Sequence, residues 1–125
     1  MRGILILAHG SGEKTTEETL QQVVKYLGDI FCEEVIETAY LQFSSKDLHT
    51  GLESLKAKGV DNIVVIPYFL FEGVHIKKNI PKEIDNYLKE NKDMKITIGK
   101  TLGADKRLAE ILADRIRAAV SGHVR

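Results

Sequence analysis

The stretch Gly3-Ile4-Leu5-Ile6-Leu7-Ala8-His9-Gly10 decides the fold of this chain. Its continuous apolar run, Ile4 to Ala8, is typical of a β-strand that is covered on both faces. A second run, Ile63 to Ile66, is β-branched throughout and predicts another buried strand. Strands buried on both faces belong to parallel sheets, so the sequence indicates an α/β fold.

Strand patterns and helical patterns alternate along the whole chain. We expect strands at 4–8, 34–41, 63–66 and 94–98, and helices marked by Leu20 to Leu27, Leu48 to Leu55, Ile80 to Leu88 and Leu108 to Ala119. This alternation favours a parallel sheet with right-handed crossovers. The sequence thus predicts a single flavodoxin-like, three-layer α/β domain over residues 1–120, with four parallel strands, helices on both faces and a flexible tail at 121–125.

Polar and special residues suggest where the helices begin and end. Thr15 and Glu18 have the spacing of a capping box, and Gly28 is a plausible stop for the first helix. Ser44 or Ser45 can cap the second helix, which Gly59 closes. Pro81 suits the first turn of the third helix, although a start near His75 with a kink at Pro81 is the alternative.

Size and composition restrict the class of protein. The 125 residues suit one domain, and the formal net charge of zero gives no footprint for nucleic acid. A single cysteine, Cys32, excludes an internal disulfide. No apolar run approaches the roughly 18 residues of a membrane helix. We therefore expect a cytoplasmic protein without a membrane or nucleic-acid partner.

Two histidines follow the two most strand-like runs. His9 comes directly after the first, and His75 comes after the third strand and its loop. Carboxyl ends of parallel strands are where α/β proteins bind ligands, so both imidazoles are expected at one edge. This arrangement predicts a metal or acid/base site. The alternatives are that a backbone carbonyl satisfies His9, and that His75 lies on the surface or caps a helix.

The turn Gly10-Ser11-Gly12 admits two interpretations. Glycines allow backbone N–H groups to approach an anion, so the turn can be a phosphate cradle. It can equally be a simple tight turn. A dinucleotide fingerprint requires a third glycine at position 15, where this chain has Thr15.

The segment after the third strand is rich in aromatic and then basic residues. Tyr68, Phe69 and Phe71 place three aromatics within four residues. They can pack in the core or form a wall for a flat apolar ligand. Lys77 and Lys78 are either solvated or part of a basic rim for an anion. Further lysines at that edge are Lys14, Lys46 and Lys100.

Three segments together resemble the small sirohydrochlorin cobaltochelatases, the short members of the class II chelatases. These segments are Leu7-Ala8-His9-Gly10-Ser11, Ile66 to His75, and Leu102-Gly103 followed by a leucine-rich helix. The resemblance covers nearly the whole chain. It implies insertion of a divalent metal, with Co²⁺ ahead of Ni²⁺ or Fe²⁺, into sirohydrochlorin, a flat tetrapyrrole with eight carboxylates. It also implies a homodimer, no organic cofactor and a place in cobalamin-type biosynthesis.

The resemblance assigns roles to particular residues. The family's two metal-binding histidines correspond to His9 and His75, and neutral imidazole can both hold such metals and accept pyrrole protons. Glu72 is a candidate carboxylate ligand or base. The substrate-binding set implied at this edge is Ser11, Gln42, Tyr68, Phe69, Phe71, Gly73, Val74, Lys77 and Lys78.

The chain departs from the family pattern at two positions. Gln42 stands where relatives usually have a glutamate, and Gly12 stands where an arginine is common. Glutamine cannot accept a proton near neutral pH, although it can hydrogen-bond a substrate carboxylate. The alternative functions are therefore a metal or tetrapyrrole carrier or sensor, an iron- or nickel-selective chelatase, and a flavodoxin-like nucleotide or phosphate binder.

Overall fold

The computed structural model describes residues 1–122, except for the side chains of residues 74–77. Its elements follow the predicted βαβαβαβα order. The strands are β1 (Arg2–Ala8), β2 (Val35–Tyr40), β3 (Asn62–Pro67) and β4 (Lys95–Ile98). The helices are α1 (Lys14–Ile30), α2 (Leu48–Ala57), α3 (Val74–Glu90) and α4 (Lys106–Val120). The last three residues of the predicted tail, 123–125, lie outside the described range.

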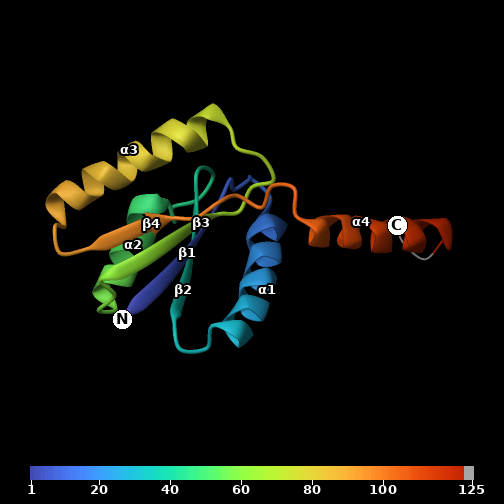
Figure 1. Cartoon of the computed structure of the whole chain (residues 1–125), viewed down its shortest axis with the longest axis horizontal. Coiled ribbons are helices and arrows are strands. Elements are labelled where there is room, and N and C mark those ends of the chain that lie inside the picture. Colours follow the sequence, from blue (N-terminus) through green and yellow to red (C-terminus); the bar gives the residue numbers. More distant parts are fainter. Residues whose placement is uncertain (123–125) are drawn as a thin grey trace.

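All four strands form one parallel sheet, as the sequence predicted, and their order is β2-β1-β3-β4. Because β1 lies between β2 and β3, the chain adds β2 on one side of β1 and then crosses over to add β3 on the other side. α1 lies on one face of the sheet and α3 on the other (Figure 1). No helix in the described part of the chain is long and apolar enough to cross a membrane.

The face that carries α2 and α3 holds the larger core. From the strands, Leu5, Leu7, Ile63 and Val65 point into it and are all fully buried. They pack against α2 and α3 through Leu48, Leu52, Leu55, Ile80, Ile84 and Tyr87. A Cβ built on Gly51 of α2 would lie 2.8 Å from Leu5 Cδ1, so a glycine there lets α2 pack closely on the sheet.

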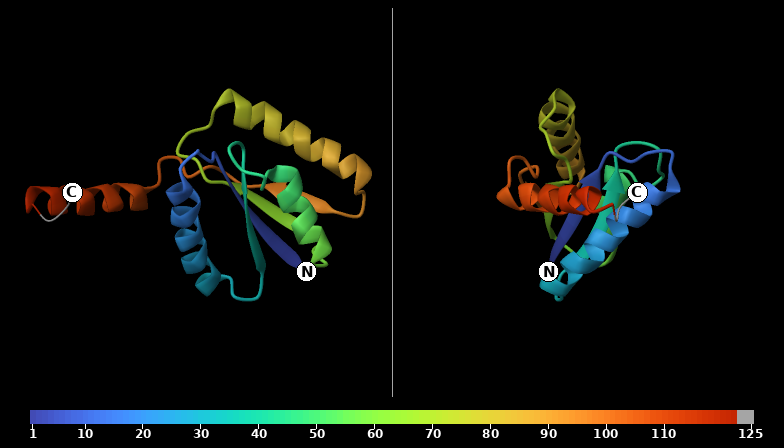
Figure 2. Two further views of the ribbon diagram at one scale, coloured as in Figure 1. Left: turned by 180° about the vertical axis from the view of Figure 1, so that it is seen from behind. Right: turned by 90° about the vertical axis from the view of Figure 1, so that its right-hand side faces the viewer.

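The opposite face carries α1 alone. Ile4, Ile6 and Ala8 of β1 pack there with Tyr40 of β2 and Leu20 of α1. On β3, the same face presents Val64 and Ile66, which are only half-buried. α4 does not cover them: none of its residues is buried, and the helix leads away from the domain (Figures 1 and 2).

Several predicted helix ends are wrong, for local reasons. α1 begins at Lys14, so Thr15 and Glu18 lie inside the helix and form no capping box, and it continues past Gly28 to Ile30. α2 is capped by Asp47 rather than by Ser44 or Ser45, because the Asp47 carboxylate accepts a hydrogen bond from the Thr50 N–H at 2.8 Å.

The third helix takes the earlier of its two predicted starts. α3 begins at Val74 and contains Pro81, so Pro81 does not occupy the first turn. Gly59 lies two residues past the end of α2 with φ at +84°, a conformation that favours glycine, as predicted for a helix stop.

Candidate active site

Backbone hydrogen bonds join the loops at the carboxyl edge of the sheet. The Tyr68 N–H donates to the Leu7 carbonyl at 2.7 Å, which ties the loop after β3 to the end of β1. The Leu41 N–H donates to the Ala8 carbonyl at 2.9 Å, and the Gln42 N–H donates to the His9 carbonyl at 3.0 Å. Gln42 and His9 therefore lie side by side, although 33 positions (42 − 9) separate them in sequence.

Gly10 is required by this close approach. Its φ is +82°, and a Cβ at this position would lie 2.2 Å from the Gln42 carbonyl oxygen. Any other residue would be strained and would push the two loops apart. Packing against the loop after β2 thus explains why position 10 is a glycine, and no anion bound in the turn is needed to explain it.

Ser11 stabilises the same turn. Its hydroxyl oxygen accepts a hydrogen bond from the Glu13 N–H at 3.1 Å and lies 2.5 Å from Thr16 Oγ1. Since Glu13 is the N-cap of α1 and makes no side-chain cap of its own, Ser11 secures the start of the helix. The Ser11 side chain has this local role whatever it contacts in a substrate.

His9 is exposed at the end of β1, and one aromatic ring fixes its orientation. The imidazole meets the ring of Phe69 edge-on, with centroids 4.4 Å apart and an interplanar angle of 77°. Phe69 is 5% exposed and therefore provides a rigid support. The buried Phe69 ring thus holds an accessible imidazole in place, which suits a ligand that must bind and then leave.

His75 is the second residue of α3, which starts seven residues after the end of β3. Since β3 is the neighbour of β1, the topology brings the beginning of α3 to the edge that carries His9. Gly73, the N-cap of α3, has an extended backbone. The side chains of Val74, His75 and Lys77 lie outside the described part of the structure, so a site shared by the two histidines stays a prediction.

The three aromatics do not form one continuous wall. Tyr68 is 39% exposed and Phe71 is 80% exposed, whereas Phe69 is buried under His9. Alternation along the extended segment explains this division, because neighbouring side chains point in different directions. Phe71 lines a second hollow of about 680 Å³ with Glu72 and Lys100.

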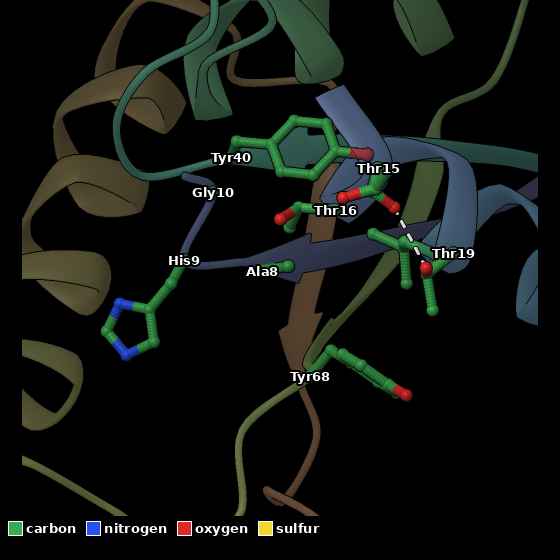
Figure 3. A pocket seen from close by; sticks show the side chains of 9 residues that line it. Ala8, His9, Gly10, Thr15, Thr16, Thr19, Tyr40 and Tyr68 are labelled. Carbon is green, nitrogen blue, oxygen red and sulfur yellow. Dashed lines mark hydrogen bonds between the residues drawn. The ribbon is translucent and has the colours of Figure 1, made fainter. Parts of the chain in front are cut away.

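A pocket of about 380 Å³ lies on the α1 side of the edge. Its lining residues are Ala8, His9, Gly10, Thr15, Thr16, Thr19, Leu20, Tyr40 and Tyr68. Figure 3 shows the threonines of α1 and Tyr68 on one side of the strand end, with the imidazole of His9 directed away from them. Burial raises the pKa of Tyr40, so this phenol stays neutral at physiological pH.

The threonines are the site feature that sequence reasoning missed. Thr15 and Thr19 are one helical turn apart, and the Thr19 hydroxyl donates to the Thr15 carbonyl at 2.8 Å. Their signal in the sequence is the run Thr15-Thr16-Glu17-Glu18-Thr19, from which we expect only a helix start. The i, i+4 spacing places two hydroxyls on the same side of the helix.

The predicted lysines are spread around the edge. Lys14, Lys46, Lys78 and Lys100 are all exposed. Among the described residues, no three side chains of His, Cys, Asp or Glu come close enough to form a metal cage. Cys32 lies at the far edge, between α1 and β2, and is exposed.

Comparison with known proteins identifies the family. The CbiX family model matches residues 3–119, which is nearly the whole chain. The chain belongs to the CbiX family. A sirohydrochlorin cobaltochelatase of Sulfurisphaera tokodaii is 32% identical over 125 residues, and the match covers 100% of this chain and 99% of that relative. Another, from Saccharolobus solfataricus, is 33% identical over 122 residues, with 93% of this chain and 94% of the relative covered.

Solved structures agree with the CbiX assignment. A putative cobalamin biosynthesis CbiX protein from Marinobacter aquaeolei superposes with a TM-score of 0.80 at 26% identity and covers 97% of this chain and 98% of its own. The sirohydrochlorin chelatase SirB from Bacillus subtilis subspecies spizizenii, in complex with cobalt, superposes with a TM-score of 0.78 at 26% identity. This match covers 93% of the present chain but only 50% of SirB, so this CbiX chain corresponds to half of that protein.

Proposed function

We propose that this CbiX chain is a sirohydrochlorin cobaltochelatase, a lyase that inserts Co²⁺ into sirohydrochlorin in cobalamin biosynthesis. The observation that carries the proposal is the 32% identity to a cobaltochelatase along all 125 residues. The exposed carboxyl edge supports it, because a flat macrocycle can lie across that edge, near the accessible His9. Co²⁺ is the metal substrate, and the chemistry requires no organic cofactor.

The reaction releases two pyrrole protons as the metal enters the macrocycle. We assign His9 and His75 to hold the metal and to accept a proton, with Glu72 assisting as a carboxylate. A neutral imidazole has a lone pair that can bind the metal or accept a proton, so it suits both purposes. A site with two protein ligands releases the metal more readily than a closed four-ligand site.

The carboxylates of the substrate have partners on both sides of His9. The hydroxyls of Thr15 and Thr19 line the pocket beside α1, and Lys100 lines the second hollow. Ser11, Gln42, Tyr68, Phe69, Phe71, Gly73, Val74, Lys77 and Lys78 complete the substrate-binding set that we propose. We further propose that the active form is a homodimer.

A metallation assay tests these roles. We expect His9→Ala and His75→Ala each to reduce the rate of Co²⁺ insertion, followed by absorbance, by about 100-fold or more. His49→Ala is the matched control, because His49 is an exposed histidine that packs on Tyr87 in α3. Unchanged rates in both site variants would remove the assignment. Parallel assays with Co²⁺, Ni²⁺ and Fe²⁺ determine the preferred metal.

Gln42 supports a second candidate function, that of a tetrapyrrole or metal carrier. Its backbone N–H donates to the His9 carbonyl, so position 42 lies next to the residue that we assign to the metal. If proton transfer limits the reaction, Gln42→Glu should increase the metallation rate by about tenfold or more, and Gln42→Ala should not. Binding of sirohydrochlorin and Co²⁺ without metallation above the uncatalysed rate would favour the carrier.

A further inference from the structure

Phe43, in the loop after β2, has a strained backbone conformation. Its φ is +59°, and within residues 1–122 it is the only residue other than glycine with a positive φ. This left-handed region is costly for a bulky side chain and is more often occupied by glycine, asparagine or aspartate. The chain therefore keeps an aromatic residue where a glycine or an asparagine would fold more easily.

Packing within the described chain offers little compensation for this strain. Phe43 is 67% exposed, so it contributes little to the core. Hydrogen bonds close the loop around it: the Tyr40 N–H donates to the Lys46 carbonyl at 2.7 Å, and the Lys46 N–H donates to Ser44 Oγ at 3.1 Å. Strained residues that a surrounding structure holds in place gather at ligand sites, which makes Phe43 a candidate for contact with a ligand.

The loop that carries Phe43 lies against the end of β1. The Gln42 N–H donates to the His9 carbonyl at 3.0 Å, and Phe43 is the next residue in the chain. Since consecutive Cα atoms are only about 3.8 Å apart, Phe43 lies close to the residue that we assign to the metal. Figure 1 shows the loops after β1 and β2 together at the carboxyl edge of the sheet.

Phe71 is the counterpart on the other side of His9. It is 80% exposed, and it follows two residues after Phe69, whose ring lies 4.4 Å from the His9 imidazole between centroids. Because β1 lies between β2 and β3, the loops that carry Phe43 and Phe71 leave the sheet on opposite sides of His9. The Leu102 N–H donates to the Phe69 carbonyl at 2.9 Å and anchors the second loop.

We propose that Phe43 is a substrate-binding residue, and that Phe43 and Phe71 hold the tetrapyrrole across His9 from its two sides. Aromatic rings stack well on flat conjugated surfaces, and burial of two exposed phenyl groups removes apolar area from water. Lys100 lines the hollow beside Phe71, where it can meet a carboxylate at the rim of the macrocycle. The inference rests on the proposed function and deepens it, because it names a residue that selects a flat ligand.

Replacement of Phe43 by asparagine separates binding from folding. Asparagine tolerates a positive φ and lacks the phenyl ring, so Phe43→Asn should leave the midpoint of thermal unfolding unchanged or raise it. The same variant should bind metal-free sirohydrochlorin about tenfold more weakly in an absorbance titration without Co²⁺. In the metallation assay, KM for sirohydrochlorin should rise by about the same factor while kcat stays within about twofold.

Three further variants test whether the ring itself is responsible. Phe43→Tyr keeps an aromatic ring and should bind within about twofold of the unsubstituted chain, whereas Phe71→Ala should weaken binding about as much as Phe43→Asn. Tyr26→Gln is the matched control, because Tyr26 is an aromatic residue of α1 that is 62% exposed and lies far along the helix from the carboxyl edge. It should bind sirohydrochlorin as tightly as the unsubstituted chain.

Two results would overturn the inference. One is a Phe43→Asn or Phe71→Ala variant that binds sirohydrochlorin as tightly as the unsubstituted chain. The other is weaker binding that comes with a lower unfolding midpoint or a changed sedimentation coefficient, since folding or assembly would then be the cause. An unsubstituted chain that binds sirohydrochlorin through these rings but does not metallate it would remove the chelatase assignment and support the inference. Normal metallation with an unchanged KM in Phe43→Asn would do the reverse.

Discussion

The two faces of the sheet are built from similar residues but reach different degrees of burial. Val64 and Val65 are neighbours on β3, yet Val65 is fully buried under α2 and α3, whereas Val64 is half-buried beside α1. Two helices seal one face and a single helix covers part of the other. The comparison indicates that one face carries the stability of the domain, while the other is available for association.

The largest effect is expected in the core of the sealed face. Leu52→Ala removes a fully buried side chain of α2 and should reduce the free energy of unfolding by about 2–5 kcal/mol. Leu112→Ala on α4 provides the contrast at 62% exposure and should cost far less. Urea denaturation at one fixed protein concentration measures both. Equal losses would show that α4 is as well packed as α2.

A matched pair on β3 sharpens the comparison. Val65→Thr buries a hydroxyl without a water partner and should cost about 1–3 kcal/mol. Val64→Thr makes the same chemical change on the half-buried face and should cost less than about 0.5 kcal/mol. Urea denaturation measures both variants, and equal costs of Val64→Thr and Val65→Thr would show that the two faces of β3 are buried alike.

The smallest effect concerns how the helices of the two faces begin. Asp47 caps α2, and Asp47→Ala should cost about 1 kcal/mol. The backbone N–H of Thr50 holds the pKa of Asp47 below its usual value. A carboxyl with a lowered folded-state pKa stabilises above its unfolded pKa and loses this contribution as the pH falls through its folded pKa. The difference between parent and variant should therefore be constant above about pH 5 and shrink below about pH 4.

Glu13→Ala at the start of α1 is the corresponding control, because Glu13 makes no side-chain cap. Its effect on thermal unfolding should be within about 0.5 kcal/mol and should not follow the pH dependence of Asp47→Ala. A cost as large as that of Asp47→Ala would show that the two helix starts are stabilised alike.

The fold was predictable because the apolar strands and the amphipathic helices leave plain patterns in the sequence. The apolar runs of β1 and β3 and the periodicity of the helices predicted the element order and the parallel sheet. The helix ends were less predictable, since several nearby residues can cap a helix and only the three-dimensional path of the loop selects Asp47 over Ser44 or Ser45.

The candidate site was predictable only in part. The parallel direction of the strands follows from the alternation of elements, so the placement of His9 at the carboxyl edge could be expected. The role of Phe69 as the buried support of His9, and the row of threonines beside it, could not. These contacts join residues far apart in the chain, and no local pattern specifies them.

The sequence by itself determined the family, the four-stranded parallel sheet and the histidine that ends β1, because short-range patterns and motif residues carry that information. Only the tertiary structure decided that Gly10 is required by the Gln42 carbonyl, that the three aromatics face different surroundings, and that α4 leaves the domain with its apolar stripe exposed. The physical reason is that periodicity specifies which side of a helix is apolar, whereas the surface that covers this side depends on the path of the whole chain.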